Sequence, residues 1–164
     1  FEQSARVPLI IAAPGASKNG GVAATPVGLI DLYPTLTKLC GVEAPSNLQG
    51  QDLRPILMDP STVGRGWAIS QVTRGGRGKG TFGFTLRTPR WRYTEWDQGN
   101  RGRELYDHET DPLEQTNLAE VAEHAERVAE FSNALQEAAA NTLPESGEIP
   151  TIREGVWAPN LTDP

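Results

Sequence analysis

The alternation of apolar and polar side chains over residues 67–107 most constrains the fold, because only a β-strand places every second side chain on one face. In the clearest run, 81–87, three apolar side chains point to one face and Arg87 to the other. Turn-forming residue types separate this run from its neighbours. The predicted strands are 67–71, 81–87, 91–96 and 104–107. We therefore predict an antiparallel meander of about four strands.

A small sheet alone is marginal in water, so one of its faces needs a cover. Apolar residues recur at helical spacing between Asn117 and Asn141 and predict one long helix packed on the sheet. Asp111 or Asn117 is placed to cap this helix. Residues 142–164 are rich in Pro, Gly and polar residues and are predicted to form an extended tail.

The apolar run Val7–Ala13 has the composition of a buried strand in a parallel sheet. Such a strand needs neighbours on both sides, and the sequence offers no obvious βαβ partner for it. Phe1 is also not a typical natural start, because neither a Met nor a targeting segment is present. We therefore expect the chain to be a C-terminal fragment whose first strand belongs to a larger sheet.

A helix is predicted to begin at Thr25-Pro26 and to end at Gly41. Pro34 lies inside this pattern and lacks an N–H, so we expect a kink or a restart near Asp31. A short helical turn is expected within residues 50–58. The predicted organisation is α/β overall and α+β within this chain. Its parts are the end of a large α/β domain (1–60), an antiparallel subdomain with its helix (61–141) and the tail (142–164).

The residues that usually carry catalysis are scarce. The sequence has no Gly-x-Ser-x-Gly, no His-Glu-x-x-His and no phosphate-binding loop. The single cysteine, Cys40, is expected to be a small buried side chain, and His124 to be solvated among glutamates. A metal site from Asp107, His108 and Asp111 is conceivable, but such residues in turns are usually hydrogen-bonding and capping groups. We predict no catalytic and no metal-binding residue in this chain.

Positive charge is concentrated in one segment. Nine of the fifteen basic residues lie between Arg65 and Arg103, although the net charge of the chain is −6. This basic strip is a plausible field for an anionic ligand, and a solvated face would give the same count. The glycine-rich run 74–80 is open to three interpretations: a flexible hairpin loop, a loop leaning over an anionic substrate, or an RNA-binding segment.

Four segments, in this order, resemble the C-terminal portion of sulfatases of the alkaline phosphatase superfamily, and the third favours the iduronate-2-sulfatase-like branch. The first is Phe1-Glu2-Gln3-Ser4-Ala5-Arg6-Val7-Pro8-Leu9-Ile10, and the second is Asp31-Leu32-Tyr33-Pro34-Thr35-Leu36 with 39–42 and 48–53. The third comprises Ser70-Gln71, Arg74, 83–88 and Arg92-Tyr93-Thr94-Glu95-Trp96. The fourth is Glu104-Leu105-Tyr106-Asp107 with 111–114 and Asn117-Leu118.

The resemblance implies a sulfatase that hydrolyses sulfate esters, of sulfated sugars or glycosaminoglycan-like polymers, after export to the periplasm or the outside of the cell. It also implies a formylglycine nucleophile beside a calcium ion, both expected in an N-terminal catalytic part that this chain contacts. Cys40 is followed by Gly-Val-Glu-Ala rather than x-Pro-x-Arg, so it is not the nucleophile. The chain alone is expected to be inactive.

Three residues are predicted to contact substrate. Arg74 and Arg87 occupy positions that match the resemblance, and a guanidinium binds sulfate or carboxylate oxygens through paired hydrogen bonds. For Arg87, an ion pair with Glu95 or Asp97 is an equal alternative. Trp91 is placed to stack on a sugar ring, although cover by the helix is also open to it.

Two other functions remain open at this stage. The same superfamily fold also suits an arylsulfatase or a phosphate or phosphonate ester hydrolase. A non-catalytic module that binds nucleic acid through the basic strip is the alternative of another class. We expect no nucleic-acid partner. We also expect no membrane partner, because no apolar stretch approaches the length of a transmembrane span.

Overall fold

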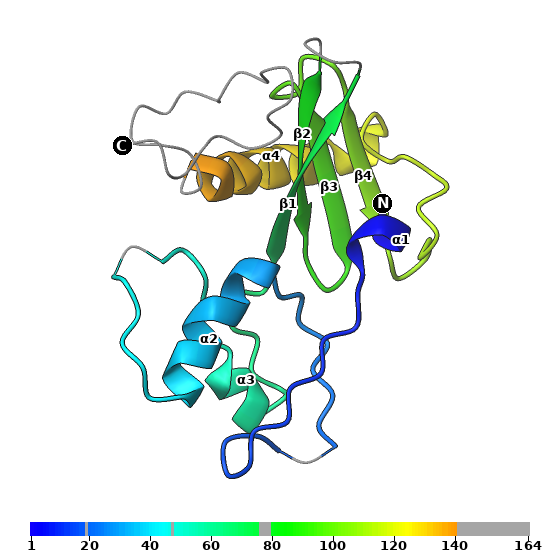
Figure 1. Cartoon of the computed structure of the whole chain (residues 1–164). Helices are drawn as coiled ribbons and strands as arrows, with labels where there is room; N and C mark the ends of the chain where they lie inside the picture. The colour runs from blue at the N-terminus through cyan, green and yellow to red at the C-terminus, as the bar shows by residue number, and fades with distance from the viewer. Residues whose placement is uncertain (19, 47, 76–79, 141–164) are drawn as a thin grey trace, which may run out of the picture.

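The structure is a computed structural model and describes residues 1–18, 20–46, 48–75 and 80–140. Four strands form one antiparallel sheet in chain order, which confirms the predicted meander (Figure 1). They are β1 (Ala68–Arg74), β2 (Thr81–Arg87), β3 (Trp91–Trp96) and β4 (Arg103–Asp107). The α+β architecture of the chain is therefore the predicted one.

One long helix covers one face of the sheet, as predicted. A short 3₁₀ turn (Ala122–His124) leads into α4 (Ala125–Ala140), which crosses behind the strands in Figure 1. The fully packed core between the two layers comprises Leu86, Trp91, Tyr93, Leu105, Leu135 and Ala138. The alternating side chains of the strands thus supply one wall of the core and the apolar stripe of α4 the other.

The covering helix begins later than its apolar pattern predicts, and neither expected capping residue caps it. Asn117 accepts hydrogen bonds from the backbone N–H groups of Leu105 and Ala119, at 2.9 and 3.0 Å. Asp111 accepts from Gln115 and Thr116, at 2.8 Å each. Both side chains therefore organise the connection after β4 rather than the start of the helix.

A second group of elements lies below the sheet in Figure 1. It comprises a 3₁₀ turn (Leu29–Asp31), α2 (Leu32–Leu39) and α3 (Arg54–Met58). The prediction that a helix begins at Thr25-Pro26 is wrong, because the Thr25 hydroxyl donates to the carbonyl of Val63 at 2.7 Å instead of capping. The restart near Asp31 is confirmed. Pro34 falls in the first turn of α2, where a backbone N–H needs no helical partner.

Asp31 holds this second group together. Its side chain is fully buried and accepts hydrogen bonds from the backbone N–H groups of Gly28 and Gln51, at 2.8 Å each. Both of its oxygens also accept from Arg65, at 3.0 and 3.1 Å. One carboxylate therefore joins the start of α2 to the segments before α3 and before β1.

The N-terminal segment differs most from its prediction. After the short helix α1 (Glu2–Ala5), residues 6–13 form no strand, and the side chains of Val7 and Ile10 are 61% and 90% exposed. A strand needs a neighbour for its N–H and C=O groups, and β1–β4 pair only with one another within the described residues. The buried strand predicted at Val7–Ala13 is therefore not formed in this chain.

Candidate functional site

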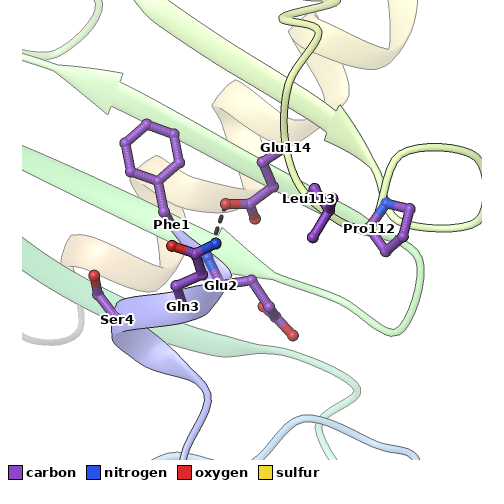
Figure 2. Close-up of a pocket in the computed structure, with 7 residues that line it drawn as sticks. All are labelled: Phe1, Glu2, Gln3, Ser4, Pro112, Leu113 and Glu114. Carbon is purple, nitrogen blue, oxygen red and sulfur yellow. Dashed lines mark hydrogen bonds between the residues drawn. The ribbon is translucent and has the colours of Figure 1, made fainter.

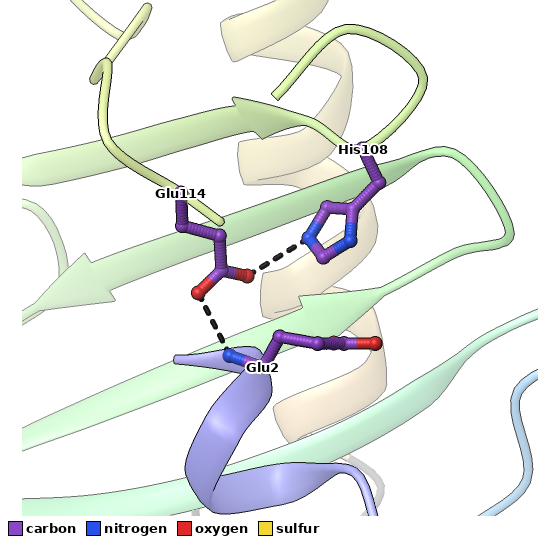
Figure 3. A group of neighbouring side chains, drawn as sticks. All are labelled: Glu2, His108 and Glu114. Atoms are coloured by element: carbon purple, nitrogen blue, oxygen red, sulfur yellow. Dashed lines mark hydrogen bonds and ion pairs between the residues drawn. The ribbon is translucent and has the colours of Figure 1, made fainter. Parts of the chain in front are cut away.

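The face of the sheet opposite α4 carries a buried group of charged side chains, which we name the arginine–glutamate network. Its members are Glu2, Arg87, Arg92, His108 and Glu114. They come from α1, β2, β3 and the connection after β4, so segments far apart in the sequence meet here. Figure 3 shows three of them in front of the sheet, with the covering helix behind it.

The sheet register brings the two arginines together. Arg87 and Arg92 are direct partners across β2 and β3 and so lie on the same face. Like charges opposite each other destabilise a sheet unless anions lie between them. Glu2 provides this anion, because its carboxylate accepts from Arg87 Nε at 3.0 Å and from Arg92 Nη2. Arg87 thus forms an ion pair, as the alternative interpretation predicted, but its partner is Glu2. The predicted partners Glu95 and Asp97 pair with Arg103 and Arg101 instead.

Glu114 completes the network from the other side. Its backbone has a φ of 57°, a left-handed conformation that directs its side chain back over the sheet. Its Oε1 accepts from Arg92 and from His108 Nε2, and its Oε2 accepts from the backbone N–H of Glu2 at 2.7 Å. Arg92 is 2% exposed, so both glutamates are needed to compensate its charge.

The hydrogen bonds of His108 define its tautomer. Arg87 Nη2 lies 2.9 Å from Nδ1, and a guanidinium can only donate, so Nδ1 accepts. The proton then sits on Nε2, which lies 2.8 Å from Glu114 Oε1. His108 therefore links the guanidinium of Arg87 to the carboxylate of Glu114.

The network shifts the acidity of both glutamates. Burial alone would raise the pKa of Glu2, but the hydrogen bonds and charges of Arg87 and Arg92 lower it from 4.5 to about 2. Burial also opposes ionisation of Glu114. Its hydrogen bond from the Glu2 backbone, the charge of Arg92 and the hydrogen bond of His108 together lower its pKa. Both side chains are therefore carboxylates at neutral pH.

This shift predicts a loss of stability in acid. The folded pKa of Glu2 lies below its unfolded value, so its contribution is present above about pH 4.5 and is lost as the pH falls toward about 2. We expect the melting temperature to fall over this range, and to fall less steeply in Glu2→Gln. Thermal melts of both proteins between pH 6 and pH 2 test this. Parallel curves would show that Glu2 is not the titrating group.

The network does not suit a metal ion. Ligand atoms of Glu2, His108 and Glu114 lie within 4.8 Å of one another. However, both carboxylates already form ion pairs with arginine, and Nδ1 of His108 accepts a hydrogen bond from Arg87. A calcium ion prefers oxygen ligands and would be repelled by both guanidinium groups. We therefore derive no chemistry through a metal at this position.

The metal site considered from the sequence is not formed either. Asp107 accepts two hydrogen bonds from Arg90, at 2.8 and 2.6 Å, and Asp111 bonds to backbone N–H groups. His108 joins the network instead. Both aspartates accept hydrogen bonds from backbone N–H groups in the turns after β4, as aspartates in turns commonly do.

A pocket of about 270 Å³ lies beside the network, between α1 and the connection after β4 (Figure 2). Its lining residues are Phe1, Glu2, Gln3, Ser4, Pro112, Leu113 and Glu114. Both of its carboxylates are paired, and it holds no cysteine or histidine. The pocket thus offers no activated nucleophile of the kind that ester hydrolysis needs.

Arg74 lies on the same face as the network but outside it. Its guanidinium lies over the ring of Trp96 at 4.4 Å and over the ring of Phe1 at 5.7 Å. Trp96 is buried, and its Nε1 donates to Glu104 at 3.0 Å. Among the predicted substrate residues, Arg74 is thus the one whose charge faces no carboxylate partner in the described part of the chain.

Trp91 lies in the core under α4. It is 9% exposed, and the guanidinium groups of Arg90 and Arg127 lie over its ring at 4.9 and 4.3 Å. The ring of His124 meets it edge-on, with 5.8 Å between centroids. Trp91 is therefore covered by the helix, which was the alternative to stacking on a sugar ring. It is left out of the substrate surface proposed below. The solvated His124 of the sequence analysis is instead a partly buried neighbour of this ring.

Cys40 is exposed at the C-terminal end of α2, so the prediction of a buried side chain is wrong. No described helix is long and apolar enough to cross a membrane.

A four-stranded antiparallel sheet covered on one face by a helix defines an α+β domain. The family of N-sulphoglucosamine sulphohydrolase C-terminal domains matches residues 1–141. The chain belongs to this family and is the C-terminal domain of a sulfatase of the alkaline phosphatase superfamily, as its motifs indicated.

Curated relatives agree with this assignment. Arylsulfatase K from Xenopus laevis is 32% identical over 145 residues, which cover 83% of this chain and 26% of that protein. Human arylsulfatase K is 32% identical over 127 residues, which cover 73% of this chain and 23% of that protein. The chain therefore spans about a quarter of the length of these relatives.

Solved structures show the same fold. A 2-O GAG sulfatase superposes with a TM-score of 0.62 at 28% identity, covering 76% of this chain and 27% of that one. A protein in complex with its substrate D-glucosamine-2-N,6-O-disulfate gives 0.67 at 26%, covering 78% and 27%. The phosphonate monoester hydrolase of Agrobacterium radiobacter gives 0.57 at 26%, covering 69% and 25%.

Proposed function

We propose that the protein to which this domain belongs hydrolyses sulfate esters of sulfated sugars or glycosaminoglycan-like polymers. The match of the sulfatase C-terminal family to residues 1–141 carries this proposal. Two structural neighbours support the substrate class, one being a 2-O GAG sulfatase and the other a complex with a disulfated glucosamine. The iduronate-2-sulfatase-like branch remains our prediction from the third motif.

In this proposal the domain forms one wall of the substrate cleft, and an N-terminal part of the same protein supplies the chemistry. That part would hold the formylglycine nucleophile and the calcium ion. Here the arginine–glutamate network fixes α1 on the sheet and so positions the residues that follow it. Arg87 acts within this network, and its predicted contact with substrate is secondary to its contacts with Glu2 and His108. Export to the periplasm or outside the cell fits sulfated polymers as substrates.

Exposed apolar side chains mark the surface that meets the catalytic part. They lie on residues 7–10, on the 3₁₀ turn before α2 and on α2 itself. They include Val7, Ile10, Leu29, Ile30, Tyr33 and Leu36, each 47–90% exposed. Several large exposed apolar side chains of this kind are typical of a surface that contacts another part of a protein. The domain spans about a quarter of its relatives' length, so the remaining three quarters are the proposed occupant.

Hydrolysis of phosphate or phosphonate esters is the second candidate, favoured by the phosphonate monoester hydrolase among the structural neighbours. Binding of nucleic acid has less support. Of the basic strip, Arg87, Arg90, Arg92 and Arg103 are paired with carboxylates of the domain itself. Phosphate contacts would need those charges to be free.

A direct assay separates these functions. The full-length parent protein, matured so that formylglycine forms, should release sulfate from a sulfated disaccharide, whereas the 164-residue chain alone should release none. Aryl sulfate, aryl phosphate and phosphonate monoester serve as comparison substrates. Faster turnover of the phosphorus esters would favour the second candidate, and turnover by the isolated chain would overturn the placement of the active site.

A further inference from the structure

The guanidinium of Arg74 is held in place by aromatic rings rather than by carboxylates. It lies over the Trp96 ring at 4.4 Å and over the Phe1 ring at 5.7 Å. Contacts of this type attract a cation to the ring face and leave the N–H edge of the guanidinium available. The orientation of Arg74 is therefore fixed without use of its hydrogen-bond donors.

The ring beneath Arg74 is itself fixed. Trp96 lies against Gly83 of β2, where an added Cβ would come within 2.8 Å of the indole. The indole N–H donates to Glu104 at 3.0 Å, and Trp96 is 8% exposed. Gly83 thus leaves room for the indole to lie across the sheet, and Arg74 rests on a platform that does not need to rearrange when a ligand arrives.

The other arginines that the structure describes in the sheet and its turns are paired with carboxylates. Each forms an ion pair with a carboxylate of the domain; these are Arg87, Arg90, Arg92, Arg101 and Arg103. In the described part of the chain, the guanidinium of Arg74 forms no such pair and donates no hydrogen bond. An exposed, oriented and unneutralised guanidinium is suited to bind an anion from outside the protein.

We propose that Arg74, on its Trp96 and Phe1 platform, binds a sulfate or carboxylate group of an acidic saccharide. The planar donors of the guanidinium match a pair of anion oxygens, and the neighbouring ring edges accommodate the apolar face of a sugar. This inference rests on the proposed function and adds to it a subsite within the domain itself. Binding at this subsite involves no covalent step.

Binding to the chain itself tests the inference without catalysis. The probes are a sulfated disaccharide lacking carboxylate, an unsulfated uronate disaccharide and a neutral disaccharide, followed by NMR of the Arg74 Nε–H and Trp96 Nε1–H groups. We expect one or both acidic sugars to shift these signals and the neutral sugar to leave them in place. Arg74→Gln should weaken binding by about fivefold or more, as loss of charged hydrogen bonds requires.

Matched variants make the result specific. Arg101→Gln removes the same charge from a neighbouring exposed arginine whose partner is Asp97, and it should change affinity by less than about twofold. Arg74→Lys keeps the charge but loses the paired donors and the stacking, so it should bind with intermediate strength. Equal losses in Arg74→Gln and Arg101→Gln, or no binding by the unmodified chain, would overturn the subsite. Sulfate release by a full-length Arg74→Gln enzyme with an unchanged KM would reject the subsite while leaving the proposed activity intact.

Discussion

Replacing Arg92 with methionine should lower the free energy of unfolding of this domain by about 3–5 kcal/mol, the usual cost of removing one partner from a buried ion pair. Arg92 is 2% exposed and contacts the carboxylates of Glu2 and Glu114. Without it, two partly or fully buried anions face each other with only Arg87 and His108 to compensate them. Urea denaturation followed by tryptophan fluorescence measures the change.

The matched control is Arg54→Met, which removes the same charge from a pair with Asp52 whose side chains are 42% and 29% exposed. Solvent screens that pair, so its loss should cost only a small fraction of the stability lost in Arg92→Met. A second variant separates charge from packing: adding Glu114→Gln to Arg92→Met should recover part of the loss, since one unpaired anion is removed. Similar costs for Arg92→Met and Arg54→Met would mean that the network is not an electrostatic unit.

The sequence predicted the sheet and its covering helix because their signals are local. Alternation within 81–87 and the helical period after Asn117 each depend on residues a few positions apart. The boundaries were less certain, since Asn117 forms its hydrogen bond with the backbone of Leu105 and not with the helix that follows. Contacts between elements override local capping preferences at such positions.

The network could not be predicted in the same way. Glu2 contacts Arg87 and Arg92, which lie 85 and 90 residues away in the sequence, and no periodic pattern of residues predicts such a contact. The motif resemblance did mark its parts, since Phe1-Glu2, Arg92 and Glu114 all lie in matching segments. It did not show that they contact one another. The one local signal was the alternation that placed Arg87 on the face away from the apolar layer.

The segment Val7–Ala13 fails for a different reason. Its composition specifies burial, but burial of a strand requires partner strands, and β1–β4 bond only to one another among the described residues. The composition of a segment therefore indicates that it needs partner strands, but not whether the same chain contains them. The high exposure of Ile10 is the direct consequence.

Asp31→Ala should cost about 3–5 kcal/mol of unfolding free energy, because Asp31 is fully buried and its removal leaves charged and polar donors without an acceptor. The backbone N–H groups of Gly28 and Gln51 would lose their acceptors, and Arg65, whose side chain is 18% exposed, would lose its only ion pair among the described residues. Unlike Arg92, Asp31 serves the elements below the sheet. Its loss should therefore increase amide hydrogen exchange around α2 and α3 before it affects β2 and β3.

Two variants test this assignment. Asp59→Ala removes an exposed aspartate whose side chain, among the described residues, hydrogen-bonds only to Ser61 in its own turn, so it should destabilise the protein far less than Asp31→Ala. Asp31→Asn keeps the shape of the side chain but turns an amide N–H₂ toward a donor. Its unfolding free energy should therefore be close to that of Asp31→Ala and well below that of the unmodified protein. If Asp31→Asn instead retains full stability, the carboxylate charge is unnecessary and Arg65 finds compensation elsewhere. In that case Asp31 would act only as a backbone acceptor that organises the entry to α2.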